Sequence, residues 1–169
     1  AQQQNAVRAP ESPSTCKASQ LSATMDRRES DAIDGGLGHH AMTIAIQNQS
    51  SSSCILYGVP KLTLSYSANR PFAVELCSNC GGYLFDKQPV TNIALEPTKS
   101  AYLVMGYNVN DGNGHVHCTE SNTAMLLRLY LPNQSEPLGI TIPEARICGD
   151  IYVTPFLAKP PVDGSLPRH

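Results

Sequence analysis

The sequence has little charge and no long apolar run, and each absence excludes a class of protein. Charged residues make up 15% of the 169-residue chain, and the formal net charge is only −2. No run of lysine or arginine marks a basic face, so nucleic acid is not an expected partner. The longest apolar runs, such as AMLL and AYLVMGY, are far too short to span a bilayer, so we expect no transmembrane segment.

Tryptophan is absent and lysine and glutamate are scarce, whereas six cysteines are present. Cytosolic proteins of this size rarely carry so many thiols, while exported proteins use them in disulfides. The first residues, AQQQNAVRAPESPST, are polar and are typical of a mature N-terminus left after signal-peptide removal. We therefore expect an extracytoplasmic protein, located in the periplasm, on the cell surface or outside the cell.

No window has the period of an amphipathic helix, and short alternating runs occur almost throughout. In HAMTIAIQN (40–48), Met42, Ile44 and Ile46 alternate with Thr43 and Gln47, as in a half-buried strand. Clusters of Gly, Asn, Asp and Pro separate the runs. The predicted strands are 19–26, 40–48, 54–67 with a bend at Gly58 and Pro60, 72–77, 91–97, 100–109, 124–132, 138–144 and 150–156. Eight or nine short strands at this spacing predict an all-β sandwich or a barrel-like relative.

Dispersed motifs along the chain resemble those of a known family. They are CKASQL, GGLGHHAMTIAIQNQS, NQSSSSCILYGVPKLTL, VTNIALEPTKSAYLVMGY, LLRLYLPNQ and ICGDIYVTPF. Over residues 16–156 the chain resembles bacterial exported domains of unknown function, a family common in actinobacterial secreted proteins and lipoproteins. The family's usual Gly-Tyr-Pro and Pro-Gly are replaced here by YGVP (57–60) and by Pro97-Thr98. The resemblance implies an immunoglobulin-like β-sandwich of about eight to nine strands and export, and it implies no activity.

We therefore predict three parts: an N-terminal tail (1–15), a disulfide-stapled sandwich (16–156) and a Pro-rich C-terminal tail (157–169). Neither tail has the apolar content to dock on its own sandwich, and ordering one residue costs about 1–2 kcal/mol of backbone entropy. We expect both extended tails to contact another polypeptide. In the C-terminal tail the candidate anchors are Leu157, Val162 and Leu166.

Four dispersed cysteines can be paired by assuming that successive strands run antiparallel in one sheet. This assumption places Cys16 and Cys54 at the same end of the sheet. With the strand 138–144 lying between its two neighbours, it also places Cys118 near Cys148. The preferred pairs are therefore Cys16–Cys54 and Cys118–Cys148, each worth about 3–4 kcal/mol by loop-closure entropy. The pairing Cys16–Cys118 with Cys54–Cys148 stays open, because four cysteines allow three connectivities.

Cys77 and Cys80 stand in CSNCGGYL and admit three interpretations. As zinc ligands they need a second pair, for which His115 and His117 in GHVHC are the candidates. A thioredoxin-like redox pair needs a helix N-terminus within an α/β context, which this sequence does not offer. A local Cys77–Cys80 disulfide that grips an exposed loop fits an exported protein and is the preferred interpretation.

Residues that copper favours suggest a metal site as the alternative, namely His39, His40, Met42, Met105, His115, His117 and Cys118. Both methionines fall on core-facing strand positions, and adjacent histidines often face solvent in a turn, so we expect no metal and no cofactor. NVNDGNG (108–114) contains Asn108, Asn110 and Asp111 but lacks the glutamate that an EF-hand requires. We interpret it as a long hairpin loop.

Two further patterns concern modification and catalysis. Asn48-Gln49-Ser50 and Asn133-Gln134-Ser135 are sequons in predicted turns, which places both asparagines on the surface. No G-x-S-x-G nucleophile elbow occurs, and no pair of acidic residues obviously converges. We therefore predict no catalytic residue and no enzyme.

These observations favour a non-catalytic structural or interaction subunit of a larger cell-envelope or extracellular assembly. Its partners would be other protein subunits, contacted through tails and loops, and association with a membrane complex is one form of this. A rival hypothesis is a metal-binding module that uses His115 and His117 with Cys77 and Cys80, or with the His39-His40 pair. A third is an inhibitor or ligand-binding domain that presents the CSNC loop.

Overall fold

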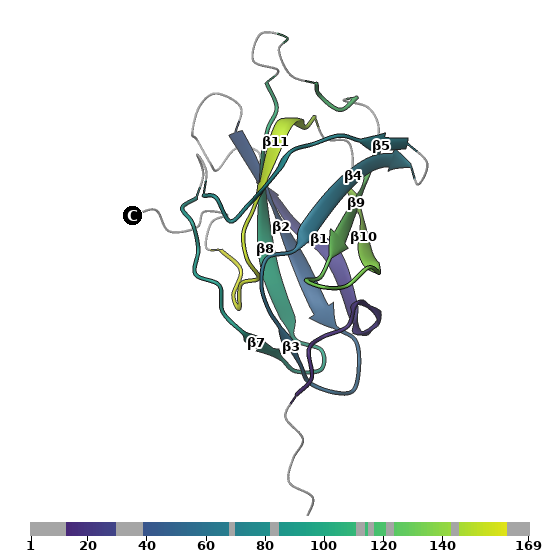
Figure 1. Cartoon of the computed structure of the whole chain (residues 1–169), viewed down its shortest axis with the longest axis vertical. Helices are drawn as coiled ribbons and strands as arrows, with labels where there is room; N and C mark the ends of the chain where they lie inside the picture. Colours follow the sequence, from purple (N-terminus) through teal and green to yellow (C-terminus); the bar gives the residue numbers. More distant parts are fainter. Residues whose placement is uncertain are drawn as a thin grey trace, which may run out of the picture.

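The described part of the chain consists of short strands and one 3₁₀ turn (Figure 1). The computed structural model describes residues 13–29, 39–67, 70–81, 85–110, 114, 117–120, 124–142 and 146–161. The elements are η1 (Ala18–Gln20), β1 (Leu21–Glu29), β2 (His39–Asn48), β3 (Cys54–Leu56), β4 (Lys61–Ser67), β5 (Arg70–Phe72), β6 (Leu76–Ser78), β7 (Ile93–Leu95), β8 (Ser100–Asn108), β9 (Met125–Tyr130), β10 (Pro137–Ile142) and β11 (Cys148–Val153). Within these ranges, no helix has the length and apolarity needed to cross a membrane.

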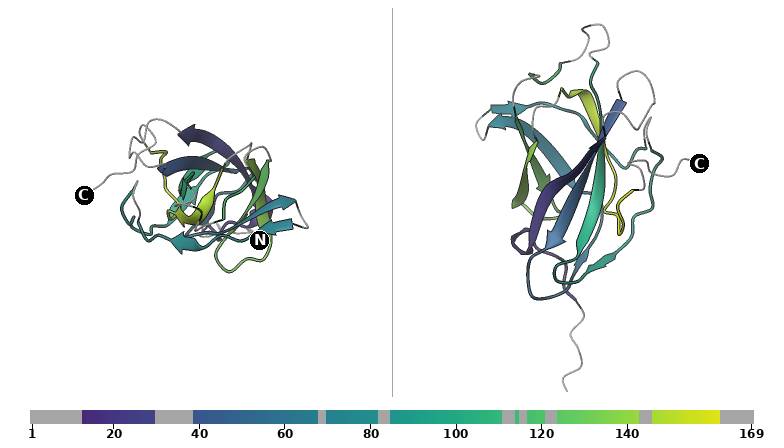
Figure 2. Two further views of the ribbon diagram at one scale, coloured as in Figure 1. Left: turned by 90° about the horizontal axis from the view of Figure 1, so that it is seen from above. Right: turned by 180° about the vertical axis from the view of Figure 1, so that it is seen from behind.

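Three sheets form the architecture. The largest has the strand order β1-β2-β8-β11-β6, the second has the order β10-β9-β4-β5, and a small third sheet pairs β3 with β7. All strand pairs are antiparallel except β11 with β6. Figure 2 shows from behind how β1, β2 and β8 lie side by side, with the second sheet packed against them. The predicted all-β sandwich is confirmed.

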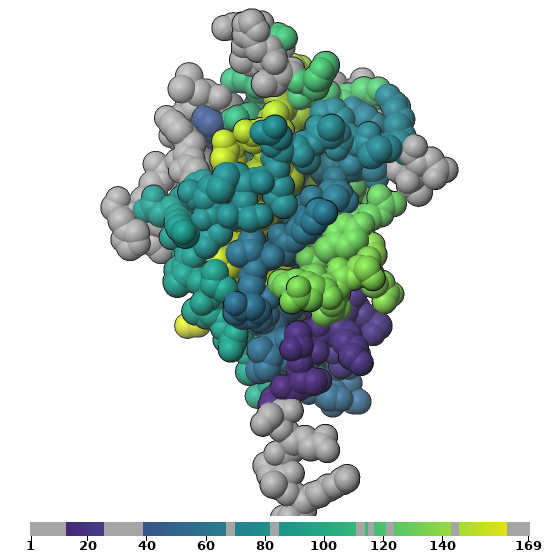
Figure 3. Space-filling model, viewed as in Figure 1, coloured from purple at the N-terminus to yellow at the C-terminus, as the bar shows by residue number. Residues whose placement is uncertain are grey.

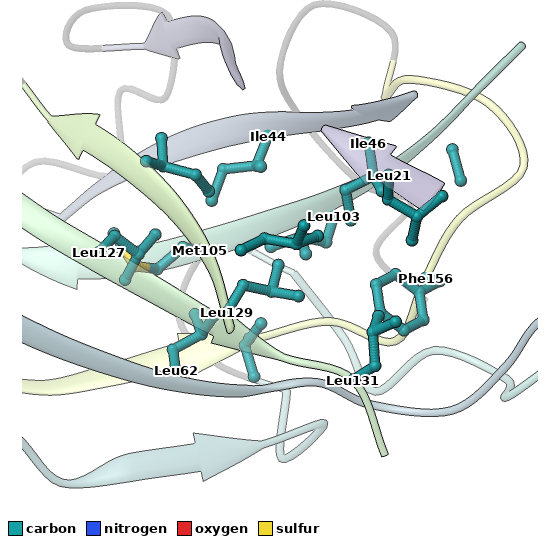
Figure 4. Packing of buried hydrophobic residues seen from close by; sticks show 14 of the residues in the cluster. Leu21, Ile44, Ile46, Leu62, Leu103, Met105, Leu127, Leu129, Leu131 and Phe156 are labelled. Atoms are coloured by element: carbon teal, nitrogen blue, oxygen red, sulfur yellow. The ribbon is translucent and has the colours of Figure 1, made fainter. Parts of the chain in front are cut away.

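Alternation along the central strands directs apolar side chains into the space between the two larger sheets. Ile44 and Ile46 of β2 lie beside Leu103 of β8 in the buried core. Leu127 and Leu129 of β9 belong to the same core and come from the opposite sheet (Figure 4). Burial of one such side chain contributes about 1.5–3 kcal/mol. The core is therefore built from the period-two pattern that the sequence displays.

Two predicted strands are divided in the structure. The run 54–67 forms β3 and β4, and the run 72–77 is broken between β5 and β6. The first break lies at Gly58, which has φ of +93°, a conformation that non-glycine residues rarely adopt. A Cβ atom at Gly58 would also lie 2.9 Å from Cγ of Pro132. The chain therefore turns from the small sheet into the second sheet where glycine allows close contact with the β9–β10 turn.

The strand arrangement differs from the one assumed when the cysteines were paired. β2 lies between β1 and β8, not beside the 54–67 run, and β9 and β11 belong to different sheets. The disulfides are nevertheless Cys16–Cys54, Cys118–Cys148 and Cys77–Cys80. Residues 14–16 run parallel to β3, with Thr15 opposite Ile55, and this brings the first pair together. The preferred pairs are thus those of the structure, although only the antiparallel pairings of β1 with β2 and of β9 with β10 match the assumed arrangement.

Part of the outer face of the five-stranded sheet, around Ala41 and Val104, is covered by irregular chain. Phe85 is 3% exposed and packs with Ala41 and Val104 in a second, smaller cluster, which Tyr152 and Leu157 border. Gly106 lies beneath the Phe85 ring, and a Cβ there would be 3.2 Å from it. We call the segments 79–81 and 85–90 the outer cover.

Asn48 is buried, and the expectation that it lies on the surface is wrong. It is 0% exposed, and its Nδ2 donates to the carbonyl oxygens of Ser52 (2.8 Å) and Leu95 (2.9 Å). Its Oδ1 accepts from the N–H and the hydroxyl of Ser50. An asparagine amide has both donors and acceptors, so it can close this turn and tie it to β7. The other sequon residue, Asn133, is exposed as expected.

Candidate functional site

The CSNC loop folds as a structural clamp. Cys77 and Cys80 are bonded to each other, and no free cysteine is present. Between them Asn79 adopts φ of +50° and is 9% exposed. Its Nδ2 donates to the carbonyl of Gln88 (2.9 Å), and the N–H of Gln88 donates to Asn79 Oδ1 (2.9 Å). The backbone N–H of Asn79 also donates to the carbonyl of Val153 (2.8 Å).

This loop therefore ties the outer cover to the edge of the five-stranded sheet. Gly81, at φ of +70°, leaves no room for a side chain, because a Cβ would lie 2.9 Å from the backbone nitrogen of Lys87. The disulfide closes the motif on itself, and Asn79 and Gly81 hold it close to residues 85–90.

Of the candidate metal ligands from different strands, Met42 and Met105 lie opposite each other in the described residues, within the core. No group of three or more His, Cys, Asp or Glu side chains gathers into a metal-binding arrangement in the described residues. Cys77 and Cys80 offer no thiolate while they are bonded to each other. The carbonyl of His117 accepts from the N–H of Gly149 (3.1 Å), and His115 lies outside the described residues.

The other proposed ligands lie in the core or beside residues of β8. Met42 and Met105 are fully buried between the sheets, as their strand positions predict. The ring of His40 lies 5.8 Å from that of the buried Tyr107. Burial lowers the pKa of His39 from its ordinary value of 6.5, and a hydrogen bond with the Asn108 side chain offsets part of that shift.

A polar contact at the β4–β5 hairpin holds residues 117–120 in place. The guanidinium of Arg70 lies 4.4 Å from the centroid of the Tyr66 ring, and its Nη2 is 2.8 Å from Oε1 of Glu120. The backbone N–H of Glu120 donates to the Tyr66 hydroxyl (3.0 Å). Both charged side chains are more than half exposed, so the ion pair adds little free energy. We assign this cluster a structural role.

One surface of the described chain is hollowed in three places around the β9–β10 turn. The first hollow, about 390 Å³, is lined by residues 15–16, 55–57, Asn92 and 131–134. We call it the Tyr57 hollow. Two neighbours, of about 620 Å³ and 480 Å³, share Asn133 and Gln134 with it. In Figure 3 the lime surface of this turn borders the blue surface of β3–β4 and the purple surface of the N-terminal segment. Because they share Asn133 and Gln134, the three hollows form one continuous concave surface.

Tyr57 and Asn92 enter this hollow because of how β3 and β7 pair. Leu56 of β3 lies opposite Ile93 of β7, and Tyr57 and Asn92 are the next residue on each side. Tyr57 is 54% exposed, although it follows directly after the buried Leu56. Val90, 44% exposed, lies two residues before Asn92. Tyr57 and Val90 are the exposed large apolar side chains of the described part of the chain.

The floor of the Tyr57 hollow is fixed by Gln134. Its Oε1 accepts from the N–H of Ala18 (3.1 Å), and its Nε2 donates to the carbonyl of Cys16 (2.7 Å). Cys16 is in turn bonded to Cys54 at the start of β3. Three distant segments of the chain are therefore held together around the hollow.

The proposed tail anchors are only partly described. Leu157 pairs with Tyr102 of β8 through N–H···O bonds of 2.7 and 2.9 Å, and it packs against the cluster under the outer cover. Leu157 is thus held by its own sheet and is half-buried. Val162 and Leu166, like residues 1–12, lie outside the described residues.

Comparisons with known proteins identify a family but no activity. The sequence model of a family described as "Domain of unknown function (DUF4232)" matches residues 16–157. No curated protein matches the chain. Among solved structures, the chain is similar to a selenomethionine-labelled β-glucosidase from Kluyveromyces marxianus, with a TM-score of 0.35 and 9% sequence identity. That similarity covers 76% of this chain and 14% of the enzyme, and it carries no argument about fold or function.

Proposed function

The chain belongs to this family of domains of unknown function, and from that premise we propose that it is a non-catalytic, extracytoplasmic interaction subunit. In this proposal it is an immunoglobulin-like sandwich, exported as in actinobacterial relatives, and it serves a larger cell-envelope or extracellular assembly. Three disulfides support the oxidising compartment, because such bonds persist outside the cytosol.

The Tyr57 hollow is the observation that carries the proposal. An aromatic side chain beside a concave surface can anchor a bound partner, and Tyr57 is 54% exposed beside this hollow. Disulfide Cys16–Cys54 and the two Gln134 hydrogen bonds hold the surrounding segments in place. A surface that is already ordered loses less entropy on binding. This arrangement suits a subunit that recognises a partner without reacting with it.

Fractionation of the source cells tests the proposed function. We expect the tagged full chain to sediment with the cell envelope or to elute in a complex much larger than its own 18.2 kDa. Tyr57→Ala should release a substantial share of it, while Val90→Ala, which removes exposed apolar surface outside the hollow, should not. Recovery of the wild-type chain only as a free monomer would contradict the proposal.

A further inference from the structure

The residues that line the Tyr57 hollow carry no charge. Among the described residues that form it there is no Lys, Arg, His, Asp or Glu. The two flanking hollows differ, since one includes Lys61 and the other includes Lys17 and Glu136. A charged ligand would lie in the Tyr57 hollow without a partner of opposite sign, and desolvating it there would cost free energy. The lining therefore suits a neutral ligand.

Amide side chains supply the polar groups at the rim. Asn92 and Asn133 are both exposed, and each amide offers two N–H donors and a carbonyl acceptor. Asn133 has φ of +61°, which turns the backbone sharply at the point where all three hollows meet. Groups that both donate and accept match a ligand that is rich in hydroxyls.

The exposed ring of Tyr57 supplies the apolar part of the surface. The face of an aromatic ring is negative, so it attracts the weakly positive C–H groups of a saturated ring laid flat on it. Pyranose sugars present such a C–H face together with hydroxyls around their edge. The hollow, at about 390 Å³, is within the size range of small-ligand sites.

A peptide that binds by strand addition is not matched, because both edges of β3 are occupied. One edge of β3 is paired with β7, and the other is occupied by residues 14–16. The N–H of Ile55 donates to the carbonyl of Ser14 (2.8 Å), and the carbonyl of Ile55 accepts from the N–H of Cys16 (2.9 Å). An extended peptide would therefore find no free backbone edge at β3.

We propose that the Tyr57 hollow binds a neutral oligosaccharide. The Tyr57 ring stacks on the C–H face of one sugar, and the side-chain amides of Asn92 and Asn133 exchange hydrogen bonds with its hydroxyls. The flanking hollows extend the surface, so a polymer chain gains contacts that a single sugar lacks. This inference rests on the proposed function and names the partner class, a polysaccharide of the surrounding envelope or matrix.

A titration of the purified, fully oxidised chain tests the proposal. The probes are maltohexaose, cellohexaose and mannohexaose as neutral saccharides, hexagalacturonate as an anionic one, and a peptide with the sequence AKPPVDGSLP as a proline-rich one. Two-dimensional ¹⁵N NMR follows the backbone signals of residues 55–57 and the side-chain amide signals of Asn92 and Asn133. At least one neutral hexasaccharide should shift these signals in a saturable way, and hexagalacturonate should bind more weakly.

Substitutions of Tyr57 show whether ring stacking, and not another contact, accounts for saccharide binding. Tyr57→Ala should weaken the binding about tenfold or more, whereas Tyr57→Phe, which keeps the ring, should change it about twofold at most. Val90→Ala is the control for loss of exposed apolar surface and should bind like the wild type.

Three outcomes would overturn the inference: no saturable shift with any neutral saccharide at millimolar concentrations, equal binding by Tyr57→Ala, or preferred binding of the peptide. If the chain nevertheless remains in the envelope fraction in a Tyr57-dependent manner, the interaction function stands and only the saccharide assignment fails. If saccharides bind but the chain is never found in an assembly, the saccharide assignment stands and the interaction function fails.

Discussion

The inner face of the five-stranded sheet packs Ile44 and Leu103 against an opposing sheet, whereas part of its outer face lies under irregular chain that carries Phe85. The inner face is buried by strands whose backbone groups are already paired. The outer cover, in contrast, is held by the Cys77–Cys80 disulfide and by individual hydrogen bonds of Asn79. Part of a sheet can therefore be buried on both faces although only one face meets another sheet. The two faces should differ in how far a local defect spreads.

Leu103→Ala should produce the largest effect. Leu103 is fully buried in the core between the sheets, so truncation removes packing that cannot be replaced by solvent. We expect a loss of about 3–4 kcal/mol in the free energy of unfolding, with one cooperative transition in urea. A loss below about 1 kcal/mol would contradict the assignment of the inner face as the stabilising one.

Phe85→Ala should cost less and act locally, about 2–3 kcal/mol, because its ring is buried in a small cluster on the outer cover. Hydrogen exchange of the Gln88 N–H, which donates to Asn79, should accelerate strongly. Exchange in the β2–β8 ladder should change little by comparison. Equal acceleration in both places would show that the two faces unfold as one unit.

The double substitution Cys77→Ser with Cys80→Ser should cost about 2 kcal/mol, since the disulfide closes a loop with a sequence separation of only 3. The matched control, Cys16→Ser with Cys54→Ser, removes a disulfide with a sequence separation of 38. It should lower the free energy of unfolding by about twice as much. The urea midpoints of the two variants measure how much each disulfide contributes to stability. A larger loss at the short disulfide would mean that the outer cover carries more of the stability than we infer.

The smallest effect concerns pH. Burial lowers the pKa of His39 in the folded chain below 6.5, so the unfolded chain binds the proton more readily. The stability contributed by neutral His39 is therefore present above about pH 6.5 and declines as the pH falls through the lower folded pKa. His39→Gln should reduce the loss of stability between neutral pH and about pH 5. If the variant loses as much stability as the wild type over this pH range, His39 is not the cause of the loss.

The same contrast explains what the sequence could reveal. The inner face follows alternation such as Met42, Ile44 and Ile46, so the strands and the sandwich are predictable from their period. Phe85 lies in no periodic run, and its burial depends on a loop held by contacts between residues 79 and 88. Periodicity carries no information about such contacts, so the outer cover was not predicted.

The Tyr57 hollow was missed for a related reason. Tyr57 stood out only as part of YGVP, where the chain departs from the usual family pattern. Its neighbours Asn92 and Asn133 are distant in sequence and meet it only because β3 pairs with β7 and the β9–β10 turn contacts Gly58. The exposed asparagine at position 133 was the one usable signal, and it was interpreted as a sequon.

The buried amide of Asn48 makes N-glycosylation and folding mutually exclusive at this position. A glycan on Nδ2 would occupy the atom that donates to Ser52 and Leu95, in a site with no solvent access. In a eukaryotic secretory host, oligosaccharide transfer to the nascent chain would thus compete with closure of the 48–53 turn. A chain modified at Asn48 would not reach the folded state, whereas modification of the exposed Asn133 would leave folding intact. The choice of expression host therefore decides the yield of native protein, and a host that lacks the transferase avoids the competition.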